Sequence, residues 1–213
     1  MALAVPLSRF TSQVGGGSAF FVRCHRAMPI PPAFVEATDW LLLKTAIHGF
    51  GDSDNVSEDD LLAALRVAEV WRERFTEPFT FEFRGEQITW FRYESLVWTL
   101  GESFRRLMLR GRRLRRCERV FEAVRSLCCD GRFGKGRESF IMLLGKYGGA
   151  DQIPTLIDLL DDPQICGHAV YALRLLGASE AADKIRPFLG SSKTWMRQEA
   201  RKYFQKIEPV EQT

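Results

Sequence analysis

Two stretches near the end of the chain predict its architecture: IMLLGKYGGADQIPTLIDLL at residues 141–160 and YALRLLGASEAADKIRPFLG at residues 171–190. Both contain Leu-Leu-Gly followed by apolar residues at the same spacing, so that Gly145 in the first stretch matches Gly177 in the second. The other matching positions are Leu143, Leu144, Ile153, Leu156 and Ile157 in the first stretch and Leu175, Leu176, Ile185, Phe188 and Leu189 in the second. A period of this length indicates stacked helical units that cover one another's apolar faces.

The residues around these stretches predict helix pairs. Residues 139–147 and 153–160 form the first pair, and residues 166–176 and 180–189 form the second. A last helix over residues 194–207 lacks the Leu-Leu-Gly ending and is rich in arginine and lysine. A more polar final helix is what the capping unit of a repeat array requires. Such an array offers a surface for a partner more readily than a pocket for chemistry.

The repeat region resembles the HEAT-like repeats of many bacterial proteins, including the phycobilin-lyase type. The resemblance covers residues 136–207, about a third of the chain, and rests on the short helix pairs, the Leu-Leu-Gly turn and the junction at Asp162 and Pro163. It implies a short α-solenoid. It implies no single function, because HEAT-like repeats serve adaptors, inhibitors, scaffolds and nucleic-acid binders alike.

The part of the chain before the repeats, residues 33–130, predicts helices around one β-hairpin. Apolar spacing predicts a first helix from Ala33 to about Phe50, with Phe34 and Leu41 on the same side. Ser57 is a favourable N-cap for the next helix, because its hydroxyl can accept a free backbone N–H. The fold class expected for the whole chain is therefore mostly α.

The hairpin is predicted over residues 79–91, where the apolar period changes from helical spacing to two. Phe79, Phe81 and Phe83 alternate with polar residues before a turn at Gly85, and Trp90 continues the alternation on the second strand. An isolated hairpin is marginal in water. We therefore expect these aromatic side chains to belong to the core, with a partner strand at an exposed edge as the alternative.

Two further segments predict the domain organisation. Residues 1–32 contain three arginines, three consecutive glycines and no acidic residue, which indicates a flexible or loosely docked arm, with a targeting segment as the alternative. Gly131, Gly134 and Gly136 predict a flexible junction before the repeats. The expected divisions are thus 1–32, 33–130 and 136–207.

Charge is distributed unevenly along a chain whose formal net charge is only +3. Residues 36–86 hold an excess of seven acidic residues, and residues 105–125 hold an excess of seven basic ones. The basic excess comes from an arginine block that we single out as the candidate partner-binding site. Its candidate residues are Arg105, Arg106, Arg110, Arg112, Arg113, Arg115, Arg116 and Arg119, and Arg125 follows them.

Three interpretations of the arginine block stay open at the level of sequence. Guanidinium groups bind carboxylate or phosphate through two parallel hydrogen bonds, so the block fits an acidic protein partner or the phosphates of a nucleic acid. The third interpretation is internal: the arginines pair with the acidic segment at residues 36–86 and with solvent.

No arrangement of residues predicts catalysis. His25, His48 and His168 lie in no recognisable nucleophile or metal motif. The five cysteines form an odd set without recurring spacing, which favours a reducing compartment, and Cys117 and Cys128 are expected to pack as small apolar groups on one helix face.

These observations predict a cytoplasmic, non-catalytic protein-binding module that acts as an adaptor, an inhibitor or an immunity-type protein. The chain has no run of about 18 apolar residues, so no membrane span is expected. No cofactor and no metal are expected either. The alternative function is a HEAT-like protein that binds nucleic acid through its arginine block.

Overall fold

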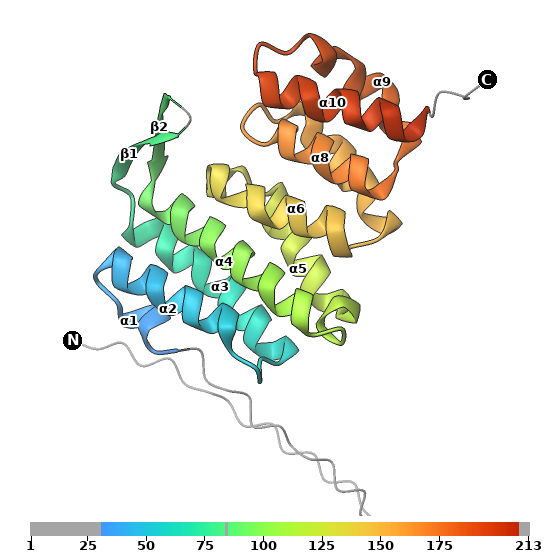
Figure 1. The fold of residues 1–213 in the computed structure, drawn as a ribbon. Coiled ribbons are helices and arrows are strands. Elements are labelled where there is room, and N and C mark those ends of the chain that lie inside the picture. The colour runs from blue at the N-terminus through green and yellow to red at the C-terminus, as the bar shows by residue number, and fades with distance from the viewer. Residues whose placement is uncertain (1–30, 84, 209–213) are drawn as a thin grey trace, which may run out of the picture.

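The protein, described by a computed structural model over residues 31–83 and 85–208, is mostly helical with one small β-hairpin (Figure 1). This confirms the predicted fold class. The arm predicted over residues 1–32 lies outside the described residues, apart from Pro31 and Pro32. Cys24 and His25 also lie outside them.

The structure gives the following bounds. The α-helices are α1 (Ala33–Glu36), α2 (Trp40–Asp52), α3 (Glu58–Arg74), α4 (Arg92–Arg110), α5 (Glu118–Cys129), α6 (Glu138–Tyr147), α7 (Ile153–Asp158), α8 (Cys166–Leu176), α9 (Ala182–Ile185) and α10 (Thr194–Ile207). The strands are β1 (Pro78–Phe83) and β2 (Glu86–Phe91). The 3-10 helices are η1 (Leu114–Arg116), η2 (Gly131–Arg137), η3 (Ala150–Gln152), η4 (Leu159–Asp161), η5 (Ser179–Ala181) and η6 (Arg186–Gly190).

The helices form two layers. In the first layer α2, α4, α6, α8 and α10 follow one another side by side, each in contact with the next (Figure 1). In the second layer α3 packs on α4 and α5, α5 packs on α6, and α7 packs on α8. One hydrophobic cluster runs between the layers from Phe34 to Tyr203 and crosses the predicted boundary at residues 131–136.

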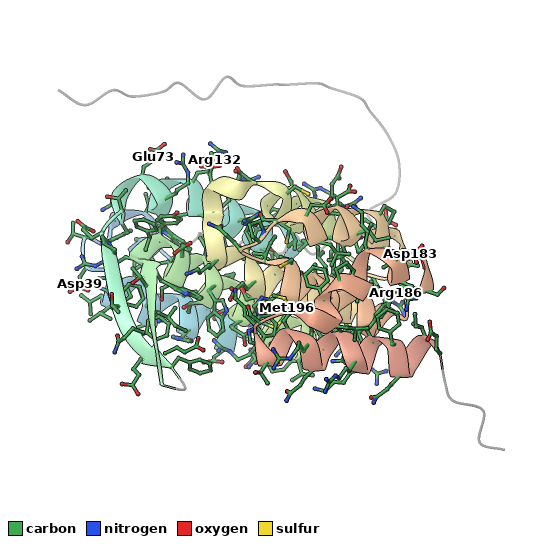
Figure 2. All side chains as sticks on the ribbon, turned by 90° about the horizontal axis from the view of Figure 1, so that it is seen from above. Asp39, Glu73, Arg132, Asp183, Arg186 and Met196 are labelled. Carbon is green, nitrogen blue, oxygen red and sulfur yellow. The ribbon has the colours of Figure 1, made fainter. Side chains whose placement is uncertain are left out.

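Most charged side chains lie at the periphery of these layers, with Asp60, Glu94 and Arg137 as buried exceptions. Figure 2 shows Glu73 and Arg132 projecting outward at one edge, and Asp183 and Arg186 near the C-terminal end. Met196, by contrast, is buried at the start of α10. The separation of apolar and charged side chains is what burial of apolar area requires of a stack of amphipathic helices.

The interval between equivalent helices corrects the period predicted from Leu-Leu-Gly. The equivalent helices α6 and α8 are capped at their C-termini by Gly148 and Gly177, an interval shorter than the predicted one from Gly145 to Gly177. Gly145 lies inside α6, where an added Cβ would come within 2.5 Å of the Ala172 Cα on α8. Gly177 instead adopts a φ of 69° that ends α8. The two Leu-Leu-Gly glycines therefore share a sequence pattern and differ in structural role.

The predicted first helix is divided into α1 and α2, which corrects its predicted bounds. Asp39 starts α2 after the break between the two helices, because its carboxylate accepts hydrogen bonds from backbone N–H groups in the first turn of α2. The side of α2 that faces the core carries Leu43, Ile47 and Phe50, whereas Leu41 is 57% exposed. The buried side therefore differs from the prediction because the helix begins anew at a cap.

The predicted N-cap of α3 is confirmed. Ser57 accepts a hydrogen bond from the Asp60 backbone N–H, and the Asp60 carboxylate accepts one from the Ser57 N–H at 2.8 Å. This reciprocal capping box satisfies two backbone donors that a helix start leaves free. It fixes the first turn of α3 beside the arginine block.

The hairpin is confirmed, and the placement of its aromatic side chains in the core is corrected. Phe79 pairs with Trp90 across the two strands, and both side chains are only half-buried, while Phe83 is 54% exposed. The rings form a row along one face of the hairpin that continues onto α2 and α4. The centroid distances are 5.1 Å for Trp40 and Phe79, 5.7 Å for Phe79 and Phe81, 6.1 Å for Phe81 and Trp90, and 6.4 Å for Trp90 and Trp98.

Two of the three glycines predicted as a flexible junction are packed against α4, which corrects that prediction for Gly134 and Gly136, whereas Gly131 is exposed. Gly134 and Gly136 are buried, and an added Cβ would clash with the Glu94 carboxylate at the first and come within 2.8 Å of the Val97 Cβ at the second. Glu94 also accepts a hydrogen bond of 2.8 Å from the Lys135 N–H. These glycines therefore allow close approach of η2 to α4.

Candidate partner-binding surface

The arginine block lies where α4 ends and α5 begins. Gly111 caps α4 by donating its N–H to the Leu107 carbonyl at 2.7 Å, and the buried Leu114 fixes the short helix η1 that follows. Cys117 then precedes α5 and contributes no side-chain cap to it. This tight connection presents the block beside the first turn of the acidic helix α3.

Two arginines of the block pair along α4. Arg105 donates from Nε and Nη2 to the same oxygen of Glu102, at 3.1 and 2.6 Å. Arg106 donates to the His48 carbonyl at 3.1 Å and lies 3.2 Å from Asp52. Burial, followed by the charge of Arg106, lowers the pKa of His48 below its ordinary value. Through Arg106 the block links α2 and α4.

Two more arginines cap the ends of helices. Arg110 donates to the Gly51 carbonyl in the last turn of α2 at 2.7 Å. Arg115 donates to the Met108 and Leu109 carbonyls in the last turn of α4, at 2.5 and 2.6 Å. The last carbonyls of a helix lack intrahelical donors and carry its negative dipole end, so cations are stabilising there. Both side chains are therefore part of the fold.

Arg119 has weak partners. Its guanidinium lies 3.6 Å from the carboxylates of both Glu58 and Asp59, and its side chain is 67% exposed. Exposed pairs at such distances contribute about 0–1 kcal/mol, because water screens them. Arg119 therefore remains available to an incoming carboxylate.

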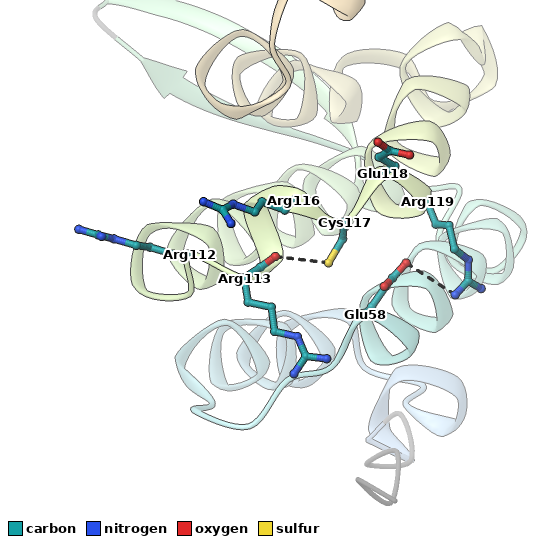
Figure 3. Close-up of a pocket in the computed structure, with 7 residues that line it drawn as sticks. All are labelled: Glu58, Arg112, Arg113, Arg116, Cys117, Glu118 and Arg119. Atoms are coloured by element: carbon teal, nitrogen blue, oxygen red, sulfur yellow. Dashed lines mark hydrogen bonds and ion pairs between the residues drawn. The ribbon is translucent and has the colours of Figure 1, made fainter. Parts of the chain in front are cut away.

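Arg112, Arg113 and Arg116 are exposed and form no side-chain hydrogen bond or ion pair with any residue that the structure describes. They border an open depression of about 730 Å³. Figure 3 shows the guanidinium groups of the arginines around it pointing in different directions. The lining residues are Glu58, Arg112, Arg113, Arg116, Cys117, Glu118 and Arg119. Four arginines against two glutamates leave the lining cationic. We call this surface the η1 surface.

Sequence reasoning missed three members of the η1 surface: Glu58, Cys117 and Glu118. Glu58 is distant in sequence from the arginine block. Its place in the first turn of an acidic helix is the one sequence signal that could have indicated a cation beside it. Cys117 is half-buried, and its thiol donates to the Arg113 carbonyl at 3.6 Å. Burial raises the pKa of Cys117, and the charge of Glu58 adds to that effect, so its thiol stays protonated near neutral pH.

The other cysteines follow the predicted packing in part. Cys128 is fully buried and Cys129 is exposed, and both are free thiols. Cys117, at the N-cap of α5, packs against the hydrophobic cluster to which Cys128 belongs, as predicted. Cys166 is buried at the start of α8.

Among residues 31–83 and 85–208, no group of three or more His, Cys, Asp or Glu side chains is arranged to hold a metal ion. Within the same ranges, no helix combines the length and the apolar character needed to cross a bilayer.

Comparisons with known proteins leave the family open. No protein-family profile matches the chain, and no curated protein is similar to it. Similar solved structures include two engineered proteins from the Northeast Structural Genomics Consortium. One has 13% identity and a TM-score of 0.41, with 82% of this chain and 78% of that chain covered. The other has 14% identity and a TM-score of 0.40, with 82% and 46% covered.

Proposed function

We propose that the protein is a non-catalytic protein-binding module, of the adaptor, inhibitor or immunity type, and that an acidic face of its partner docks on the η1 surface. The observation that carries the proposal is the set of unpaired guanidinium groups on Arg112, Arg113 and Arg116 among the described residues. An exposed cationic group without a partner has carboxylate binding capacity that the fold does not use. Arg119 adds a fourth cation whose own partners are weakly held.

The directions of these side chains favour an extended partner. The guanidinium groups of Arg112, Arg113 and Arg119 diverge around the depression in Figure 3. A compact anion would require them to converge on one point, as in a bidentate or tridentate site. A protein surface with several separate carboxylates instead meets each group where it lies.

The proposal includes the repeat type and the compartment. HEAT-like repeats are supported by consecutive helix pairs in which α6 and α8 end at Gly148 and Gly177. A reducing cytoplasm is supported by the free thiols of Cys117, Cys128, Cys129 and Cys166.

A second candidate function is nucleic-acid binding, which the planar guanidinium forks of the η1 surface also suit. One feature of the surface disfavours it. Only three of its arginines are unpaired among the described residues, so a duplex would gain few phosphate contacts, and log K would fall by only about 3 per tenfold rise in salt.

One experiment separates the two candidates. Fluorescence polarisation would measure the binding of a glutamate-rich peptide and of a 20-base-pair DNA duplex to the full chain at about 50 mM salt, where phosphate contacts are strong. We expect the peptide to bind and the Arg112→Glu/Arg113→Glu variant to abolish that binding. The matched control is Arg66→Glu/Arg201→Glu, which reverses two exposed arginines elsewhere. Binding of the duplex without binding of the peptide would reverse the assignment.

A further inference from the structure

Glu138 and His168 face each other at the contact between α6 and α8. Glu138 Oε1 lies 3.8 Å from His168 Nδ1, and the side chains are only 15% and 22% exposed, respectively. His168 Nδ1 is fully buried and has no hydrogen-bond partner among the described residues. A carboxylate oxygen and an unprotonated ring nitrogen both accept hydrogen bonds, so a hydrogen bond between Glu138 and His168 requires a proton on one of the two atoms.

The charged groups around Glu138 are mostly occupied elsewhere. On α4, the Glu94 carboxylate accepts N–H bonds from Phe91 and Lys135. On η2, Arg137 donates to the Asp162 carboxylate, and the Lys135 ammonium donates to a hairpin carbonyl. Lys193, in the loop before α10, acts electrostatically on both Glu138 and His168. No lysine or arginine among the described residues forms an ion pair with Glu138.

Burial dominates the protonation of both groups. It raises the pKa of Glu138 to about 7, an effect that the charge of Lys135 reduces and that of Glu94 increases. It lowers the pKa of His168 to about 4, and the charge of Lys193 lowers it further. Between these two pH values the carboxyl is protonated and the imidazole is neutral. A small approach of the two atoms then lets the carboxyl donate to Nδ1.

The imidazole of the pair lies against the start of the last helix. The ring of Trp195, in the first turn of α10, is 5.3 Å from the ring of His168. Trp195 also covers Gly167, where an added Cβ would clash with the indole. The start of α10 therefore packs on the residues of α8 that hold the buried imidazole.

We propose that Glu138 and His168 form a proton-sensitive contact that sets how firmly α10 docks on α8. Detachment of α10 lets water reach the pair, and each group then returns toward its ordinary affinity for protons. The contact acts independently of the η1 surface, which lies on other helices.

Titration of Glu138 and titration of His168 have opposite effects on the detachment of α10, and linkage gives the sign of each effect. Glu138 binds its proton more tightly when α10 is docked, so detachment becomes about tenfold more favourable from pH 6 to pH 8. His168 binds its proton more tightly when α10 is detached, so detachment becomes about fourfold less favourable over the same interval. The equilibrium constant for detachment of α10 in the wild-type protein, which we call the detachment constant, therefore rises about twofold from pH 6 to pH 8.

Hydrogen exchange of the α10 amides in the full chain, corrected for intrinsic rates at pH 6 and pH 8, measures this constant. We expect about a twofold rise for the wild type, about a fourfold fall for Glu138→Gln and about a tenfold rise for His168→Gln. Glu102→Gln, which alters a pair on α4 with Arg105, is the control and should follow the wild type. The same pH dependence in Glu138→Gln and wild type would overturn the proposal.

A second measurement keeps the proposal testable if a variant fails to fold. Carbon-13 NMR of glutamate carboxyls in the wild type should show one resonance that titrates near pH 7, in contrast to the ordinary pKa of 4.5. Its assignment to Glu138 rests on contact with the His168 ring protons. Titration of that resonance near its ordinary pKa would refute the proton-sensitive contact.

Discussion

The arginines between residues 105 and 119 differ in what their guanidinium groups contact. Arg110 and Arg115 donate to the carbonyls that end two helices, whereas Arg112, Arg113 and Arg116 have no partner among the described residues. Removing a capping arginine would leave helix carbonyls without donors, while removing an unpaired arginine leaves the fold intact. Variants that probe binding should therefore be confined to the unpaired arginines and Arg119.

This division could not be predicted from the sequence. The local excess of positive charge was evident, and internal pairing was one of the interpretations it allowed. However, Arg110 finds its carbonyl acceptor at Gly51, 59 residues earlier in the chain. Such partners depend on how α2 packs on α4, which no local pattern specifies. The sequence therefore located the basic segment, but it did not show which of its arginines are paired within the fold and which can bind a partner.

At the same scale, two tyrosines give opposite predictions for the loss of a hydroxyl. The buried Tyr203 donates its hydroxyl to the Ala178 carbonyl, and burial raises its pKa to about 12. We expect Tyr203→Phe to lower the free energy of unfolding by about 1–2 kcal/mol, because that carbonyl then lacks its donor. The hydroxyl of Tyr147 is buried without a partner among the described residues, so Tyr147→Phe should be neutral or stabilising. Urea unfolding would measure the free energy of unfolding of both variants. Equal losses of stability in the two variants would contradict the hydrogen-bond partners assigned to the two hydroxyls.

The elements show where local signals suffice. The capping box of Ser57 and Asp60 starts α3 as predicted, and the change of period at Phe79 gives the hairpin, because both signals act between near neighbours. The repeat period was predicted wrongly for a physical reason. Gly145 is required by close packing of α6 on α8, whereas Gly177 is required by its left-handed φ, and one tripeptide pattern contains both.

The role of Gly145 can be tested against a second helical glycine. We expect Gly145→Ala to destabilise the protein by about 1–3 kcal/mol, because its Cβ meets the α8 backbone and forces α6 and α8 apart. Gly49, in α2, has no atom within 4 Å of an added Cβ. Gly49→Ala should therefore stabilise by about 0.5–1 kcal/mol through helix propensity. Thermal unfolding of both variants provides the measurement, and a stabilising Gly145→Ala would show that the helices are not in close contact there.

On the scale of the whole molecule, one hydrophobic cluster passes from the N-terminal helices into the repeats. Phe104 of α4 meets Phe140 of α6 with ring centroids 5.5 Å apart, on opposite sides of the predicted junction. We therefore expect a single urea transition in which far-ultraviolet circular dichroism and tryptophan fluorescence coincide. Two separated transitions would instead support the division at residues 131–136.

The oppositely charged segments of the chain also lie next to each other in the folded molecule. The acidic segment at residues 36–86 lies beside the arginine block, and pairs such as Arg106 with Asp52 and Arg119 with Glu58 use part of both. What remains uncompensated in the block is concentrated on the η1 surface. Because the unpaired groups are few and exposed, their contribution to binding should depend on salt concentration. We propose an acidic protein partner as the occupant of this surface.

The most direct test uses a protein partner isolated by copurification with the wild-type chain. Its dissociation constant would be measured by isothermal titration calorimetry for the wild type, for Arg112→Glu/Arg113→Glu and for the control Arg66→Glu/Arg201→Glu. We predict that the first variant binds at least about tenfold more weakly, since reversing two interfacial charges costs more than about 1.4 kcal/mol. The control should bind as the wild type does. Equal affinities for all three proteins would contradict the proposed role of the η1 surface.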